Sequence, residues 1–230
     1  MVARAVLGLL PPGIVRLHGR IGLGNTDLTA LSADALRRVR GIRAGMIFQE
    51  PMTSLNPAMR IGRQLEEGLR LHRRLERAER RQLILEILNR VGIREAEAAL
   101  AAYPHHFSGG MRQRIMLAST MLLQPQLLIA DEPTTALDAI VQQDVLDLMV
   151  DLARERGTAI MLISHDLAMV GRYAQRMVVM AKGRIVETGA VASIMTAPQQ
   201  SYTQALLSAI PQRGPVRVRS HSTPRLVVGQ

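Results

Sequence analysis

Polar side chains follow three short apolar segments of this 230-residue chain, at the point where each segment ends. Gln49 follows segment 44–48, and Asp131 and Glu132 follow segment 127–130. His165 lies two positions after segment 159–163. Two adjacent carboxylates after a buried strand can divide the work of phosphoryl transfer. One holds Mg²⁺, and the other orients or deprotonates the attacking water. The acidic pair therefore indicates phosphoryl-transfer chemistry, with an acidic turn of no chemical role as the alternative.

A second chemical feature precedes a predicted helix. The segment 108–110 (Ser-Gly-Gly) opens a helical pattern that extends to about residue 123. Backbone N–H groups at a helix start, together with the helix dipole, favour a bound anion. Taken alone, this pattern equally fits an ordinary helix cap, and His165 alone equally fits a structural or exposed role. His105 and His106 lack metal-ligand spacing, so we expect packing or surface roles for them.

The elements that position these residues alternate between apolar strands and amphipathic helices. This alternation is typical of an α/β protein with a mainly parallel sheet, in which ligands bind at the carboxyl ends of the strands. Residues 60–123 interrupt it with helices only, which predicts an all-helical insertion. We also expect a strand over residues 14–23 and a hairpin that turns at Lys182 and Gly183.

Together, these segments resemble the ATP-binding-cassette (ABC) ATPases. The matching motifs are FSGGMRQR (107–114, signature motif), LLIADEP (127–133, Walker B), TALD (135–138, D-loop), SHD (164–166, switch histidine) and Gln49 (Q-loop). The segments IFQEPMTSLNP (47–57) and 198–211 are similar to the ATPase subunits of dipeptide, oligopeptide and nickel importers. The resemblance extends from Met1 to about Pro211. The sequence differs from the family's signature motif at Met111, where the common pattern has Gln.

The resemblance implies a P-loop NTPase (RecA-like) fold of the α/β class, with a parallel sheet core and an all-helical ABC-type insertion. The expected divisions are a partial nucleotide-binding core from the post-Walker A helix to the Q-loop (1–58), a helical subdomain ending in the signature helix (59–123), the remaining core with Walker B, D-loop and switch histidine (124–198), and a C-terminal extension with a basic tail (199–230).

The resemblance also implies roles toward ATP and Mg²⁺. Glu132 is the expected general base, and His165 is expected to contact the γ-phosphate. Metal contacts are expected from Gln49 and Asp131. The expected nucleotide-binding residues are Gln49, Ser108, Gly109, Gly110, Asp131 and Asp138. In this family the signature residues contact a nucleotide held by the opposite subunit of a head-to-tail dimer.

The family's Walker A motif, G-x-x-x-x-G-K-[ST], does not occur in this sequence, and the only lysine is Lys182. That motif cradles the phosphates with backbone N–H groups, and its lysine reaches between them. We therefore expect an N-terminally truncated subunit that lacks the family's first strands and binds ATP poorly by itself. Such a chain can still lend Ser108 and Gly110 to an intact partner.

Composition narrows the class of protein. A content of 47% hydrophobic and 21% charged residues is ordinary for a globular domain, and the absence of cysteine excludes disulfides and thiolate metal sites. The formal net charge is +10, concentrated in residues 60–94 (ten arginines, five glutamates) and 211–230 (four arginines, no acid). A basic surface can face nucleic acid, an anionic membrane or solvent. Only 2% of the residues are aromatic, which disfavours base stacking.

These observations predict the ATP-binding subunit of a peptide importer, peripheral to the cytoplasmic face of the inner membrane. The expected partners are a second ABC ATPase subunit (identical or different), two transmembrane permease subunits contacted by the helical insertion and, indirectly, a solute-binding protein, with no nucleic acid. The alternatives are a nickel importer of the same family, a cassette ATPase acting on DNA or the ribosome, and a catalytically silent interaction module.

Overall fold

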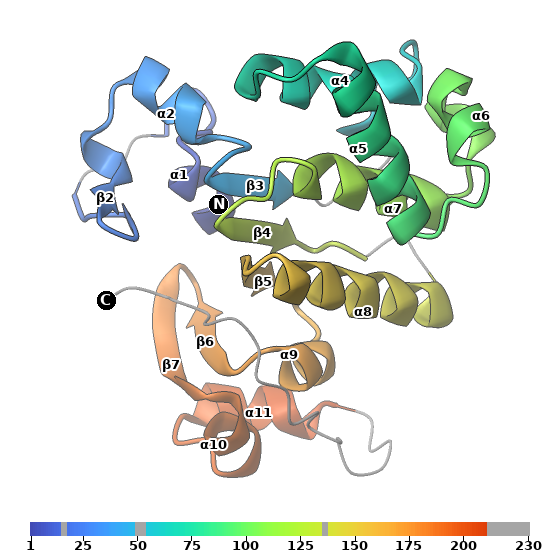
Figure 1. The fold of residues 1–230 in the computed structure, drawn as a ribbon. Coiled ribbons are helices and arrows are strands. Elements are labelled where there is room, and N and C mark those ends of the chain that lie inside the picture. The colour runs from blue at the N-terminus through green and yellow to red at the C-terminus, as the bar shows by residue number, and fades with distance from the viewer. Residues whose placement is uncertain (15–17, 49–53, 135–137, 211–230) are drawn as a thin grey trace.

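The computed structural model describes residues 1–14, 18–48, 54–134 and 138–210. Within them, three parallel strands form the central sheet, in the order β3 (Ala44–Ile47), β4 (Leu127–Asp131) and β5 (Ala159–Ile163). Figure 1 shows these strands at the centre of the molecule with helices around them. Ile47 pairs with Ala130, and Asp131 pairs with Ile163, so the three strands end at one edge of the sheet.

Strand β4 is buried on both of its faces, which agrees with its continuous apolar sequence. Leu128 and Ala130 pack into a large core with the helical part of the chain, whereas Ile129 packs into a second core with the N-terminal segment. The α/β class and the parallel sheet predicted from the sequence are confirmed.

Helices alone connect β3 to β4 in the part of the chain that the structure describes. They are α4 (Ile61–His72), α5 (Arg77–Arg90), α6 (Ala96–Ala101), the 3₁₀ turn η2 (Pro104–His106) and α7 (Gly109–Met121). The buried residues of α4 are Ile61, Leu65 and Leu69, which recur every four residues along one helix face. They pack into the same core as α7, so the helical part is joined to the sheet by a continuous apolar core.

The N-terminal segment covers the second face of the sheet. Its elements are α1 (Val2–Val6), β1 (Gly22–Leu23), β2 (Thr26–Asp27), the 3₁₀ turn η1 (Leu28–Ala30) and α2 (Ala33–Val39). The predicted strand over 14–23 includes residues 15–17, which lie outside the described residues, and among its described residues only Gly22 and Leu23 pair with a neighbouring strand, so its predicted extent is wrong there. Gly19 has φ 97°, which takes the backbone out of the extended conformation before β1 begins.

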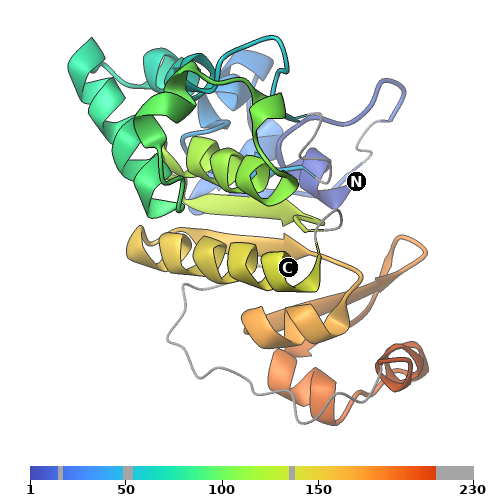
Figure 2. The ribbon, with the colours of Figure 1, turned by 90° about the vertical axis from the view of Figure 1, so that its right-hand side faces the viewer.

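Of the C-terminal elements, the first helix, α8, lies alongside β5, and the later elements lie below the sheet in the view of Figure 1; Figure 2 also shows α8 beside β5. They are α8 (Ala139–Glu155), α9 (Leu167–Tyr173), β6 (Arg176–Ala181), β7 (Arg184–Ala190), α10 (Val191–Thr196) and α11 (Ser201–Ser208). The hairpin predicted at Lys182 and Gly183 is confirmed, with both residues at positive φ between β6 and β7. None of the described helices combines the length and the apolar character that crossing a membrane requires.

Candidate functional site

The acidic pair lies where β4 ends, at the carboxyl edge of the sheet. Asp131 is the last residue of β4 and is half-buried. Glu132 follows with φ 50°, a left-handed conformation that costs a residue other than glycine about 1–2 kcal/mol. Its backbone N–H donates to the carbonyl of Ile163 on β5 at 2.9 Å, which holds the turn in place. The strained backbone thus directs Glu132 toward the end of β5.

His165 meets Glu132 across this edge. The Nδ1 atom of His165 lies 2.8 Å from Oε1 of Glu132, and the backbone N–H of His165 donates to the same oxygen at 3.0 Å. The Glu132 side chain is 17% exposed, whereas that of His165 is 78% exposed. The hydrogen bond to the Glu132 carboxylate, followed by its negative charge, raises the pKa of His165 above its ordinary value.

This pairing determines which imidazole atom can act on a ligand. Because Nδ1 faces Glu132, Nε2 is the ring nitrogen that remains for an external group. A carboxylate next to an imidazole can accept a proton, and a protonated ring donates hydrogen bonds to an anion. The edge therefore combines a proton acceptor with an anion-binding group.

The serine and glycines before α7 form a conventional helix cap. The Ser108 hydroxyl accepts a hydrogen bond from the N–H of Met111 at 3.3 Å, and Gly109 and Gly110 occupy the first turn. A Cβ added to Gly110 would lie 2.7 Å from Cγ1 of Val141 on α8. Gly110 therefore permits close contact between the start of α7 and the start of α8.

Gln113 is a residue of this region that the sequence reasoning missed. The residue is 1% exposed, and its amide nitrogen donates to the carbonyl of Pro133, immediately after the acidic pair. Its amide oxygen has no hydrogen-bond partner in the described structure. Gln113 thus ties the interior of α7 to the acidic turn. Its place within FSGGMRQR, three residues after Gly110, is the signal that could have identified it.

Of two further predicted site residues, Asp138 is described by the structure and Gln49 is not. Asp138 is exposed and is the N-cap of α8, where its carboxylate accepts the N–H of Val141 at 3.0 Å. This contact gives Asp138 a structural role beside any contact with a ligand. Gln49 lies outside the described residues, although β3, the strand before it, ends at Ile47 on the same edge as β4.

The remaining histidine pair packs as expected from the sequence. The rings of Tyr103 and His105 stack at 5.7 Å between centroids, and His106 Nδ1 accepts the N–H of Tyr103 at 3.4 Å. No group of three or more His, Asp or Glu side chains is arranged to hold a metal ion in the described part of the chain.

The sequence matches the ABC transporter family over residues 1–135. It is 50% identical over 216 residues to the peptidoglycan transport ATP-binding protein YejF of Agrobacterium fabrum, with 94% of this chain and 40% of that protein covered. It is 41% identical over 227 residues to the dipeptide transport ATP-binding protein DppD of Escherichia coli, with 98% and 69% covered. The chain therefore spans less than half the length of the first relative and about two thirds of the second.

The fold is similar to that of solved ATP-binding cassettes. One is a dimeric structure of the cassette MJ0796 in a post-hydrolysis state bound to ADP and Pi. The comparison gives a TM-score of 0.70 and 25% sequence identity, and it covers 83% of this chain and 79% of that one.

Proposed function

Because the chain belongs to the ABC transporter family, we propose that it is the ATP-binding subunit of an importer that takes up peptides across the cytoplasmic membrane. The names of the peptidoglycan and dipeptide transport relatives support this class of solute. ATP hydrolysis would drive the uptake, as the family membership implies.

The observation that carries the proposal is the contact between Glu132 and His165 beside Asp131. A left-handed turn, a backbone hydrogen bond to Ile163 and two hydrogen bonds from His165 hold one carboxylate in a defined position. Preorganisation of this kind favours transfer of a proton from a water molecule held next to the carboxylate.

Bound MgATP would supply the γ-phosphoryl group that this water attacks. Asp131 suits the metal, because Mg²⁺ prefers hard oxygen ligands and usually keeps several waters beside one or two carboxylates. Its half-buried position at the strand end leaves the carboxylate near the edge. Gln49 would be the second contact to the metal and lies outside the described residues.

The proton movements follow from the pairing of the two side chains. Glu132 would take the proton of the attacking water onto its carboxylate, and His165 would keep that carboxylate oriented through Nδ1. Nε2 of His165 would then donate to an oxygen of the phosphate, which the raised pKa of the imidazole supports. We assign Glu132 as the general base and His165 as the group that contacts the γ-phosphate.

The proposed assembly is a head-to-tail dimer with a second ATPase subunit, bound to two permease subunits at the cytoplasmic face of the inner membrane. Ser108, Gly109 and Gly110 would contact the nucleotide of the opposite subunit, together with Asp138, the last residue of the D-loop. An anion placed before α7 would benefit from the dipole of a 13-residue helix. The helical subdomain would contact the permeases, and a solute-binding protein would act through them.

Phosphate release from MgATP tests the role of Glu132. The assay uses the chain joined at Met1 to a Walker A segment of this family, because the only lysine of the chain, Lys182, lies in the β6–β7 turn. Glu132→Gln should lower kcat about 10²–10⁴-fold, because the amide cannot accept the proton of the water. The KM for MgATP should change little.

Glu95→Gln is the matched control, because Glu95 is an exposed glutamate at the N-terminus of α6 that makes no capping hydrogen bond with its side chain. It should hydrolyse ATP at the rate of the parent protein. Undiminished turnover in the Glu132 variant would remove this residue from the base role.

A further inference from the structure

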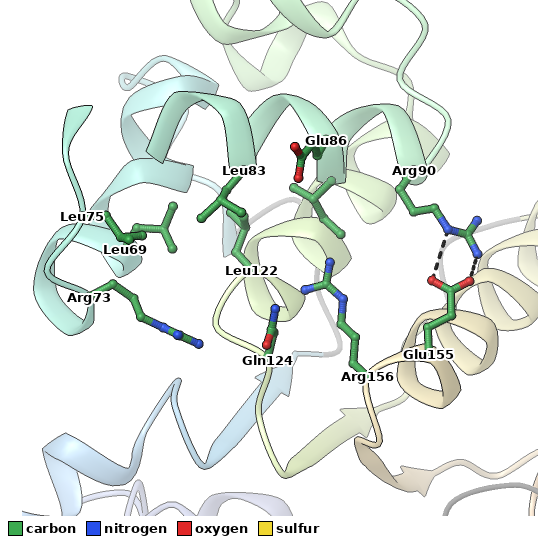
Figure 3. Close-up of a pocket in the computed structure, with 11 residues that line it drawn as sticks. Leu69, Arg73, Leu75, Leu83, Glu86, Arg90, Leu122, Gln124, Glu155 and Arg156 are labelled. Atoms are coloured by element: carbon green, nitrogen blue, oxygen red, sulfur yellow. Dashed lines mark hydrogen bonds and ion pairs between the residues drawn. The ribbon is translucent and has the colours of Figure 1, made fainter. Parts of the chain in front are cut away.

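A second candidate binding site lies at the opposite end of β4 from the acidic turn. It is a cavity of about 420 Å³ between the helical part of the chain and the end of α8, shown in Figure 3. Gln124, three residues before β4, lies on its wall. A volume of this size is within the range of small-molecule pockets. None of the residues assigned to the nucleotide lines it.

One side of the cavity is cationic. Arg73, which follows α4, and Arg156, which follows α8, enter it from two sides with Gln124 between them in Figure 3. Arg73 donates to the carbonyl of Leu123 at 3.3 Å, and Arg156 donates to the carbonyl of Met121 at 2.6 Å. Each arginine uses one guanidinium nitrogen for its carbonyl, so most of the N–H groups of both guanidinium ions remain available.

Within the described ranges, neither Arg73 nor Arg156 forms an ion pair, although the negative charge of the adjacent Glu155 acts on Arg156. The neighbouring Arg90 is paired with Glu155. Burial lowers the pKa of Arg156, so its positive charge is incompletely compensated there. Two guanidinium groups facing one cavity favour an oxyanion, because their planar donor sets match carboxylate and phosphate.

The other side of the cavity is mainly apolar, and its one carboxylate among the described residues, Glu86 on α5, accepts a hydrogen bond from Gln82 at 2.9 Å. This side is otherwise formed by leucine and isoleucine side chains from α4, α5 and the end of α7, among them Leu69, Leu83 and Leu122. A fully hydrated inorganic anion would gain nothing from this wall, whereas an alkyl group would be removed from water against it. The two sides together define a ligand with a charged head and an apolar body.

We propose that this cavity binds an amphiphilic anion, with an oxyanion head between Arg73 and Arg156 and an alkyl body against Leu69, Leu83 and Leu122. The ligand contacts the helical part and the end of α8 at once, across the seam that the Arg90–Glu155 ion pair also bridges. The site is independent of the nucleotide chemistry at the other edge of the sheet.

Isothermal titration calorimetry of the full chain tests the site with four probes. Octanoate and octyl phosphate carry the two oxyanion heads on one alkyl body, inorganic phosphate lacks the body, and octyltrimethylammonium reverses the charge. At least one of the two octyl anions should bind, and whichever binds more tightly identifies the head. Inorganic phosphate and the cation should bind at least about tenfold more weakly.

Substitution of the two arginines tests whether the octyl anion binds in this cavity. Arg73→Gln and Arg156→Gln should each weaken the octyl anion at least about tenfold, the factor expected for loss of a charge-assisted hydrogen bond. Arg74→Gln and Arg154→Gln are the matched controls, since these exposed neighbours do not line the cavity. Arg156 also supports the end of α7, so the exposed Arg73 keeps the test valid if the Arg156 variant does not fold.

The proposal is wrong if neither octyl anion binds, if the Arg73 variant binds as tightly as the Arg74 variant, or if the octyl cation binds as well as the anions. None of these outcomes bears on the assignment of Glu132 and His165, which the phosphate-release assay tests separately.

Discussion

The left-handed backbone at Glu132 aims its carboxylate at His165, two residues beyond the end of β5. A residue other than glycine keeps this conformation only where its surroundings compensate the strain. Here the compensation comes from the hydrogen bond to Ile163 and from the two hydrogen bonds that His165 donates or shares. The geometry of the candidate base therefore depends on contacts between neighbouring strands.

The contact with Glu132 predicts how His165 titrates. Its pKa in the folded chain should exceed the unfolded value near 6.5, because the carboxylate favours the protonated ring. The pair then stabilises the fold fully below pH 6.5, and this stabilisation is lost as the pH rises through the folded pKa. NMR titration of the imidazole resonances should show a higher pKa for His165 than the same residue has in Glu132→Gln. Equal values in the two proteins would contradict this coupling.

The free energy of unfolding should depend on which group replaces the Gln113 amide. Gln113→Glu places an acceptor against the Pro133 carbonyl and buries a charge, whereas Gln113→Met leaves that carbonyl without its donor. We expect Met to lower the free energy of unfolding by about 1–3 kcal/mol and Glu to lower it further. Urea denaturation measures both effects. A Glu variant as stable as the parent would mean that the amide does not support the acidic turn.

Sequence and structure differ in what they reveal about these residues. Asp131, Glu132 and His165 were identifiable as candidates, because each follows an apolar strand and matches a motif. The contact between Glu132 and His165 was not predictable, since the left-handed turn at Glu132 has no signal in residue type. Gln113 was missed because a polar residue on a helix is ordinarily exposed, whereas this one is buried.

Helices α7 and α8 contact each other near their N-termini, where Gly110 lies against Val141. Both helices begin with a capping side chain, Ser108 for α7 and Asp138 for α8. The two N-termini therefore lie near each other, and the absence of a Cβ at Gly110 permits the contact.

A paired substitution tests this contact. Gly110→Ala places a methyl group 2.7 Å from Val141 Cγ1, which is too close for two carbon atoms, so the Val141 side chain or the helices must shift. We expect a loss of about 1–3 kcal/mol in the free energy of unfolding, measured by urea denaturation. Adding Val141→Ala should recover part of the loss, because it removes the opposing methyl. Two additive losses would indicate that the residues do not meet.

The strands of the sheet were predictable because each is a continuous apolar run, and the predicted bounds agree with β3, β4 and β5 to within one residue. The segment 14–23 misled because its apolar residues are interspersed with glycines, and Gly19 takes up a positive φ there. The local pattern of apolar residues does not show which φ a glycine adopts. The proposed division into core, helical subdomain and tail remains a prediction.

Strand β4 links the two candidate sites of the molecule. The acidic turn follows its carboxyl end, and the cavity with Gln124 precedes its amino end. A five-residue strand spans about 17 Å, so the two sites lie at opposite edges of the same core. The basic character of the chain contributes to the second site, since the arginine-rich stretch 60–94 supplies Arg73.

The most direct test of the central claim follows the His165 imidazole by NMR while MgAMP-PNP is added to the chain joined to a Walker A segment. If Glu132 and His165 form the γ-phosphate end of an ATP site, the His165 resonance moves and saturates, while His105 and His106 do not move. MgAMP, which lacks the β- and γ-phosphates, should leave His165 in place. A saturating nucleotide that does not shift the His165 signal, or equal shifts with MgAMP, would contradict the account.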